Sequence, residues 1–304
     1  MAKYITGVVA ASATPVHEDF TPDTKRLVKH LRYLLDHGCD GINLLGTTGE
    51  AASFSTSQRI EIMRDVKEAG LPMDRIMVGT GVSSLLETAE LTKAADALGF
   101  NGALIVPPFY YTGIDHAGLI SYMDQLIKLL GEFNLPLYLY HIPQNTGVPW
   151  PLEVVSKLAT HYSGKIVGIK DSAGDMAYSK SVVKEVPGFQ VFPSSEASLY
   201  ESKANGFAGC ISATTNLTAA DSQIAWSKQG TPRGESAVQR ATEHRNILAK
   251  ESLVASVKAA LSVLYADPSW MRTMPPMTAR NAEQTEILKN NLTTAGWSAQ
   301  PVQI

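Results

Sequence analysis

The stretch KIVGIKD, residues 165–171, is an apolar run of strand length that ends in a lysine and an aspartate. It shows no alternation of apolar and polar positions, which is typical of a strand in a parallel sheet that is covered on both faces. Seven further runs share this pattern: 7–15, 41–46, 75–81, 102–108, 135–143, 189–195 and 209–215. The sequence therefore predicts eight strands, of which residues 165–171 form the sixth.

Amphipathic helical segments separate these runs. In the first segment, leucines recur on one helix face before Gly38, namely Leu27, Leu31, Leu34 and Leu35. Ser55 and Gln58 have the spacing of a capping box, and Ser83 precedes another leucine-rich segment. Strand, loop and helix repeat eight times over about 230 residues, which favours an α/β fold of the (β/α)8 TIM barrel type, typically about 250 residues long, over a doubly wound sheet.

The last part of the chain has a mostly helical pattern. We expect residues 1–230 to form the barrel with its active site. We expect residues 231–304 to form a C-terminal helical extension that packs on the barrel.

The composition is that of an ordinary globular protein. Of the 304 residues, 44% are hydrophobic and 18% are charged, and the formal net charge is −3, so neither nucleic acid nor an anionic membrane is an expected partner. No apolar run approaches the roughly 18 to 20 residues that span a bilayer, and the first residues, MAKYITGVVAASATP, read as a strand without a signal peptide. Cys39 and Cys210 are expected to be buried reduced thiols, which indicates a cytoplasmic compartment.

The carboxyl ends of the strands decide the chemistry, because the active site of such a barrel lies there. These ends are rich in hydroxyl groups and carry one lysine, Lys170. A lysine at this place can simply mark a strand end, or lay its stem along the core while its amine reaches water. In an enclosed mouth, however, desolvation disfavours the charged form of a lysine, and the free amine can attack a ketone to form a Schiff base. The iminium carbon is then an electron sink, so no cofactor is expected.

Two further strand ends hold groups that suit this chemistry. Tyr140 lies on the preceding run, at the same mouth, where its phenol can transfer protons; a core aromatic is the alternative interpretation. The stretch LLGTTGEAA, residues 44–52, offers the hydroxyls of Thr47 and Thr48 and backbone N–H groups before a helix, which can hold a carboxylate. An ordinary turn between strand and helix is the alternative for this stretch.

Four motifs occur in order along the chain: GTTGE at 46–50, PPFYY at 107–111, YHIPQNTG at 140–147 and GIKDSAGD at 168–175. Together they resemble the signatures of the dihydrodipicolinate synthase / N-acetylneuraminate lyase family, and the similarity runs over residues 4–230. The resemblance implies a class I lyase that forms a Schiff base with pyruvate and takes an aldehyde or a keto-deoxy acid as its other partner. It also implies a homotetramer built as a dimer of dimers.

The resemblance suggests roles for individual residues. Lys170 resembles the Schiff-base lysine, and Tyr140 resembles the acid/base tyrosine. Thr47 and Thr48 match the pair that holds the pyruvate carboxylate and relays protons.

Two residues of other motifs also match family positions. Tyr110 matches the tyrosine that, in synthase members, reaches a neighbouring subunit's site, and Ile211 matches a position whose backbone lies beside the bound keto acid. Asn145 occupies the place at which synthase members carry the arginine that binds the carboxylate of aspartate semialdehyde. An amide cannot replace a bidentate guanidinium–carboxylate pair, so the sequence disfavours the synthase activity.

The stretch PSSE, residues 193–196, also departs from the family pattern. Neuraminate lyases carry a Gly-x-Asp-Glu run here for the sugar polyol, so sialic acid is disfavoured as well. Ser195 and Glu196 are still expected to bind hydroxyl groups. With Asn145 they suggest a hydroxyl-bearing electrophile.

The sequence therefore predicts a pyruvate-dependent class I aldolase that cleaves or forms a 2-keto-3-deoxy sugar acid or a related hydroxy-2-oxo acid. Within the family, 4-hydroxy-tetrahydrodipicolinate synthase and a dehydratase of keto-deoxy sugar acids are the alternatives. Outside it, a metal-dependent barrel aldolase or hydrolase and a non-catalytic pyruvate-binding module are the alternatives. The seven histidines show no H-x-H or H-E-x-x-H spacing, so no metal ligand is assigned.

Overall fold

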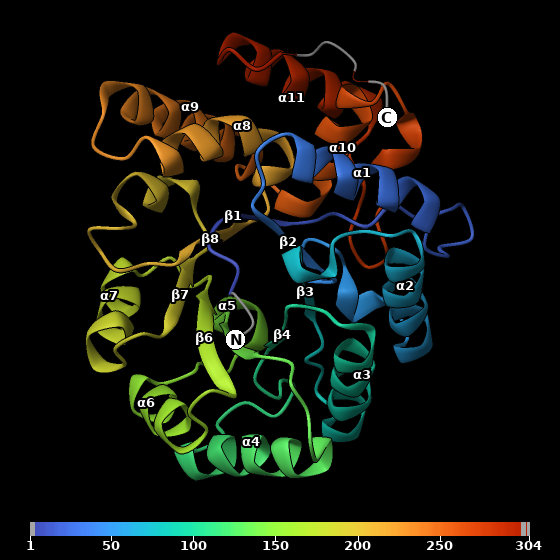
Figure 1. Cartoon of the computed structure of the whole chain (residues 1–304). Coiled ribbons are helices and arrows are strands. Elements are labelled where there is room, and N and C mark those ends of the chain that lie inside the picture. Colours follow the sequence, from blue (N-terminus) through green and yellow to red (C-terminus); the bar gives the residue numbers. More distant parts are fainter. Residues whose placement is uncertain (1–3, 299–301, 303–304) are drawn as a thin grey trace.

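The computed structural model describes residues 4–298 and 302. Residues 1–3, at the start of the expected barrel, and residues 299–301 and 303–304, at the end of the expected extension, lie outside the described residues. Its described residues form one parallel sheet of eight strands: β1 (Gly7–Ala11), β2 (Gly41–Leu44), β3 (Ile76–Gly79), β4 (Gly102–Ile105), β5 (Leu137–His141), β6 (Ile166–Asp171), β7 (Gln190–Pro193) and β8 (Gly209–Ser212). They pair in the order β7-β6-β5-β4-β3-β2-β1-β8. Between β7 and β8, Ala208 N–H donates to Val191 O at 2.9 Å, so the sheet curls into a nearly closed barrel (Figure 1). The predicted fold class is confirmed.

Within the described part of the chain, seven helices cover the outside of the barrel: α1 (Thr24–Asp36), α2 (Thr56–Glu68), α3 (Leu85–Leu98), α4 (His116–Leu130), α6 (Leu152–His161), α7 (Met176–Glu185) and α8 (Thr215–Ser227) (Figure 1). Between β7 and β8 the repeat predicts an α-helix, but the chain forms the short 3-10 helix η3 (Glu196–Glu201). Soon after η3, Gly206 takes a left-handed conformation with φ 71°, which favours a turn over a longer helix.

The predicted element ends need small corrections. Most of the eight apolar runs extend two to four residues past the hydrogen-bonded strand, because residues beyond the strand, such as Ser12 and Thr14 after β1, remain buried. The capping box of Ser55 and Gln58 is confirmed at the start of α2. The cap of α3 is Ser84, whose hydroxyl accepts from Glu87 N–H; Ser83 lies one residue too early for that bond.

The seam between β1 and β8 requires glycine. Gly7 pairs with Gly209, which has a φ of 148°. A Cβ on Gly209 would lie 1.9 Å from the carbonyl oxygen of Gly7, a distance that no side chain tolerates. The absence of a side chain on Gly209 therefore lets the last strand approach the first.

The hydrophobic core has separate inner and outer parts. Inside the barrel lie Ile5, Val9, Ala11, Met77, Leu104, Tyr138, Tyr140, Ile142, Val167, Phe192 and Ile211, which we call the interior cluster. A larger cluster fills the space between the sheet and the surrounding helices. Because both faces of each strand are covered, the strands carry uninterrupted apolar runs.

A C-terminal layer of helices α9 (Pro232–Leu248), α10 (Leu253–Leu264) and α11 (Ala282–Thr294) follows the barrel and lies beside α8 and α1 (Figure 1). This layer has its own hydrophobic cluster, which includes Trp270 and Trp297 and reaches Ala13 after β1. The division of the chain at residue 230 stays a prediction. Among the described helices, none has both the length and the apolarity needed to cross a membrane.

His30 joins the barrel to the C-terminal layer. Its ring nitrogens lie 2.7 Å from the hydroxyl of Tyr265 and 2.7 Å from Oδ1 of Asn216. Burial lowers the pKa of His30 to about 4 from an ordinary 6.5, although the hydrogen bond to Asn216 acts in the opposite direction. The imidazole is therefore neutral in the folded protein over a range in which the unfolded chain binds a proton.

This burial predicts a loss of stability in acid. As the pH falls from 6.5 to about 4, His30 binds a proton in the unfolded chain but not in the folded one. The free energy of unfolding should then fall by up to about 3 kcal/mol. Urea denaturation across this range checks the slope, which should become shallower in His30→Gln and stay unchanged in His37→Gln, whose histidine is exposed. An unchanged slope in His30→Gln would contradict the prediction.

Candidate active site

A cavity of about 600 Å³ lies at the carboxyl ends of the barrel strands. Its wall is built from the ends of several strands, the loops that follow them and parts of the C-terminal layer. Of the residues expected at the site, six line it: Thr47, Thr48, Tyr140, Asn145, Lys170 and Ile211. The barrel thus brings together residues that lie far apart in the sequence.

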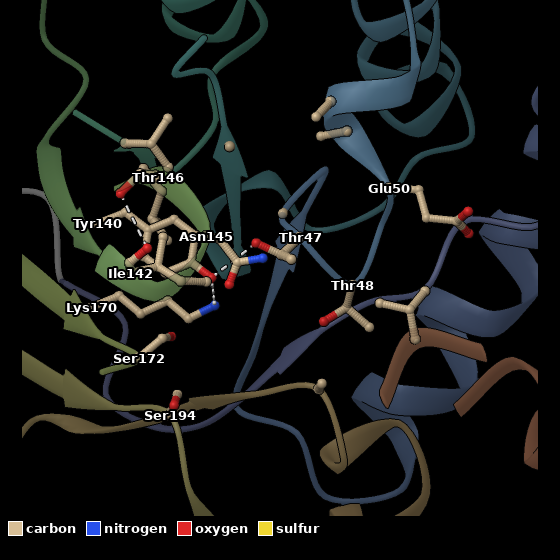
Figure 2. A pocket seen from close by; sticks show the side chains of 18 of the residues that line it. Thr47, Thr48, Glu50, Tyr140, Ile142, Asn145, Thr146, Lys170, Ser172 and Ser194 are labelled. Carbon is tan, nitrogen blue, oxygen red and sulfur yellow. Dashed lines mark hydrogen bonds between the residues drawn. The ribbon is translucent and has the colours of Figure 1, made fainter. Parts of the chain in front are cut away.

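Lys170, Tyr140 and Thr47 form a hydrogen-bonded group in this cavity. The Lys170 ammonium donates to the Tyr140 hydroxyl at 3.3 Å, and its Nζ lies 4.3 Å from the centroid of the same ring. The Tyr140 hydroxyl shares a second hydrogen bond with the Thr47 hydroxyl at 3.1 Å. Figure 2 shows the amine and both hydroxyls directed toward one another. Only 4% of Lys170 is exposed, so the amine is held in one place and largely out of bulk water.

Strand register explains why the lysine and the tyrosine meet. β5 and β6 are parallel neighbours, and Tyr140 is paired directly with Lys170. After Lys170, the Asp171 carboxylate accepts from the Ser179 hydroxyl at 2.6 Å and from Ala173 N–H at 3.0 Å, which fixes the turn that follows the strand. Strand pairing and the contacts of Asp171 therefore both fix the end of the strand that carries Lys170.

The environment of Tyr140 favours its ionised form. Burial alone would raise the pKa of the phenol, but the positive charge of Lys170 and hydrogen bonds with Thr47 and Ser172 outweigh burial and hold the pKa below its ordinary value of 10. A phenol with a lowered pKa gives and takes protons more readily near neutral pH. Tyr140 thus has the contacts that an acid/base group requires.

Contacts with the C-terminal layer hold the GTTGE loop, residues 46–50, in place. Glu50 has a left-handed backbone with φ 56°, and its carboxylate forms a fully buried ion pair with Lys258 of α10. The same carboxylate accepts from Met274 N–H at 2.5 Å, and the Lys258 ammonium donates to Arg272 O at 2.7 Å. Burial lowers the pKa of Lys258, which the charge of Glu50 partly offsets.

The loop thereby presents two threonines to the cavity. Thr47 is exposed to it and Thr48 is 5% exposed, and both line its wall. Figure 2 shows Glu50 apart from the hydrogen-bonded group, on the far side of Thr48. Glu50 is a residue whose role the sequence pattern did not reveal, although it stands in the quoted motif.

Asn145 lies in the single-turn helix α5 (Pro143–Thr146), which follows β5. It is exposed and lines the cavity beside Gln144, whose amide donates to Ser172 O at 2.7 Å. Asn145 is therefore part of the cavity wall, and its contact with a substrate stays a prediction.

Of the two serines that follow β7, Ser194 lines the cavity and the predicted Ser195 does not. Ser194 lines the wall (Figure 2), whereas Ser195 caps η3, its hydroxyl accepting from Ala197 N–H. Successive side chains of an extended segment point in opposite directions, so only one of two adjacent serines faces the cavity. Ser195 was expected to face the cavity, but of the two serines only Ser194 lines it.

Glu196 is fully buried and does not line the cavity among the described residues. Its carboxylate accepts hydrogen bonds from the hydroxyls of Thr214 and Thr218 and lies 3.3 Å from a guanidinium nitrogen of Arg245. These contacts occupy the carboxylate within the protein, which corrects the expectation that it binds substrate hydroxyls. Arg245 itself lines the cavity, from α9.

Tyr110 does not line the cavity, whereas its neighbour Phe109 does. Tyr110 is 82% exposed and has a left-handed backbone with φ 87°, and it forms an edge-to-face contact with the exposed Tyr111. Within this chain, the side chain therefore does not contact the Lys170 group. Its expected role requires a second subunit.

No cluster of three or more His, Cys, Asp or Glu side chains suited to a metal ion occurs among the residues that the structure describes. The cavity residues that the sequence did not indicate include Arg245, Val254 and Met277. All three come from the C-terminal layer, for which the sequence offered no motif.

The chain is similar to several known proteins in sequence and in fold. An uncharacterized DapA-like lyase of Chloroflexus aurantiacus is 34% identical over 211 residues, 69% of this chain and 70% of the relative. A 4-hydroxy-tetrahydrodipicolinate synthase of Methanococcoides burtonii is 28% identical over 95% of this chain and 98% of its own. The crystal structure of the chloride-inhibited dihydrodipicolinate synthase of Acinetobacter baumannii, complexed with pyruvate, has a TM-score of 0.86 at 29% identity, covering 97% of this chain and all of that one.

A family match extends over nearly the whole described chain. Residues 4–295 match the dihydrodipicolinate synthetase family. The match includes the barrel, the residues of the cavity and most of the C-terminal layer. The chain therefore belongs to the dihydrodipicolinate synthetase family and is a class I carbon–carbon lyase.

Proposed function

We propose that this lyase is a pyruvate-dependent aldolase that cleaves or forms a 2-keto-3-deoxy sugar acid or a related hydroxy-2-oxo acid. The observation that carries the proposal is the buried Lys170 amine, which lies 3.3 Å from a Tyr140 hydroxyl that is itself 3.1 Å from Thr47. An enclosed amine next to a proton-transfer group is the arrangement that Schiff-base formation requires. The pyruvate bound in the Acinetobacter structure supports pyruvate as the keto acid.

In the cleavage direction, the neutral Lys170 amine attacks C2 of the keto acid. The carbinolamine loses water, which takes the hydroxyl oxygen of C2, and leaves an iminium. Tyr140 lies within reach of that nitrogen and can supply the proton that the leaving hydroxyl needs. Thr47 and Thr48, with the N–H groups of their loop, would hold the C1 carboxylate.

The C3–C4 bond then breaks. The electron pair of that bond moves into the iminium and forms an enamine, while the C4 hydroxyl gives its proton to Tyr140 and becomes the carbonyl of the released aldehyde. Protonation of the enamine at C3 and hydrolysis by water return pyruvate and free Lys170. Thr47 would exchange protons with Tyr140 through their shared hydrogen bond. The condensation runs through the same steps in reverse.

The choice of substrate rests on the polar groups of the cavity wall. Asn145, Gln144 and Ser194 present amides and a hydroxyl there, which suit hydroxyl groups rather than a carboxylate. The synthase activity is the second candidate, because the Methanococcoides relative and others of similar length carry that name. A family dehydratase would expel water from the same iminium.

One substrate panel separates these candidates. The purified protein is incubated with 2-keto-3-deoxygluconate, with a keto-deoxy sugar diacid, and with pyruvate plus aspartate semialdehyde, and the products are identified by mass spectrometry. We expect pyruvate and a hydroxyaldehyde from the keto-deoxy acid, at least about tenfold faster than turnover of the semialdehyde. EDTA should not change the rate. Faster turnover of the semialdehyde would contradict our interpretation of Asn145.

We also propose a homotetramer in a reducing, cytoplasmic compartment. The exposed Tyr110 and Tyr111 support an interface near the PPFYY motif. Cys39 and Cys210 are buried and free, and burial raises the pKa of both thiols, which agrees with unreactive thiols.

A further inference from the structure

Arg245 lines the cavity, and one nitrogen of its guanidinium is already hydrogen-bonded within the protein. It lies on α9, its side chain is 21% exposed, and it lines the same cavity as Lys170. Its Nη1 contacts Glu196 at 3.3 Å, Ser212 Oγ at 3.0 Å and Thr214 Oγ1 at 3.2 Å. Nε and Nη2 make no hydrogen bond with the residues that the structure describes. One nitrogen therefore anchors the group, while the donors of the other two are available.

The anchoring contacts fix both the position and the charge of the guanidinium. Glu196 is fully buried, and two threonine hydroxyls hold its other oxygen, so the carboxylate cannot move away from Arg245. The ion pair is electrically balanced within the protein. A second carboxylate brought to Arg245 would leave a net negative charge in a poorly solvated wall, whereas neutral oxygen atoms would not.

We propose that Arg245 is a specificity-determining residue that binds hydroxyl oxygens at the end of the substrate remote from C2, through its Nε and Nη2 donors. This inference rests on the proposed function and adds to it the residue that recognises the hydroxyl groups of the aldehyde. A guanidinium presents two parallel N–H donors in a rigid fork, which suits neighbouring oxygens on a polyol chain. Lysine offers a single point charge and no such fork.

The test measures condensation of pyruvate with three aldehydes: glyceraldehyde, propanal and succinic semialdehyde. Propanal matches glyceraldehyde in carbon number but lacks its hydroxyls, and the semialdehyde carries a carboxylate. The wild-type kcat/KM should be highest for glyceraldehyde. In Arg245→Lys, which keeps a cation beside Glu196, kcat/KM should fall by roughly 10- to 100-fold for glyceraldehyde, mostly through KM, and by less than about threefold for propanal.

The control is Arg240→Lys on the same helix. Arg240 pairs with Asp221 at 2.6 Å and is not part of the cavity wall, so all three rates should stay at the wild-type level. Equal losses for glyceraldehyde and propanal in Arg245→Lys would overturn the proposal. So would a wild-type preference for propanal or the semialdehyde, or condensation of none of the three. Borohydride trapping of pyruvate tests the proposed function separately, since a missing adduct in the wild type would refute the Schiff base itself.

Discussion

Replacing Lys170 by methionine should abolish the covalent adduct with pyruvate and lower kcat/KM by roughly a thousandfold or more. Methionine keeps the length and the apolar stem of the side chain in its buried place, so the barrel should fold. It lacks the nitrogen that forms the iminium, and no other lysine lines the cavity among the described residues. Incubation with pyruvate and borohydride, followed by mass spectrometry of peptides, measures the adduct directly.

The matched control lies on the same stretch of chain. Lys165 stands just before β6, at the opposite end of the strand, where its ammonium donates to Phe133 O and lies over the Phe133 ring. Lys165→Met should keep both the adduct and the turnover. An adduct that persists in Lys170→Met, or that maps to a different lysine, would refute the assignment.

Replacing Lys258 by methionine should lower the free energy of unfolding by about 3 to 5 kcal/mol. The change leaves the Glu50 carboxylate fully buried without its cation, and one remaining N–H donor, from Met274, does not replace a charge. Urea denaturation at neutral pH measures the effect. The double variant Glu50→Gln/Lys258→Met should recover much of the loss, because a neutral amide needs no counter-ion.

A surface lysine provides the comparison. Lys289 pairs with Glu286 on α11 at 3.1 Å, but both side chains are exposed, so Lys289→Met should change the free energy of unfolding by no more than about 1 kcal/mol. If Lys258→Met proved as mild as Lys289→Met, the pair with Glu50 would not stabilise the fold. Suppose that Lys258→Met strongly lowers the free energy of unfolding and that the double variant is no more stable. The loss would then come from packing rather than from the unpaired charge of Glu50.

The barrel could be predicted because each strand is apolar along its whole length. The regular alternation of strand and helix then predicts that consecutive strands are neighbours, which places Lys170 beside Tyr140. The prediction of Thr47 and Thr48 in the cavity wall followed from the same rule, that functional groups lie at carboxyl ends.

Other features could not be predicted because they depend on direction and distance. Whether Ser194 or Ser195 faces the cavity depends on the residue at which β7 ends, and the predicted run 189–195 extends two residues past that point, Pro193. Glu196 looked available in the sequence, but its partner Arg245 lies 49 residues away and has no motif of its own. Pairings of this kind become visible only when the C-terminal layer is folded onto the barrel.

The interior cluster limits the routes by which a ligand can reach the Lys170 amine. Tyr138, Phe192 and their neighbours fill the inside of the barrel. A ligand therefore reaches the Lys170 amine through the cavity at the carboxyl ends of the strands. If the proposed function holds, we expect the keto acid to occupy the position at Lys170 before the aldehyde enters through the same mouth. In the cleavage direction we expect the aldehyde to leave first, because pyruvate stays bound to Lys170 until the iminium is hydrolysed. A filled barrel thus gives both ligands of the proposed reaction one shared entrance.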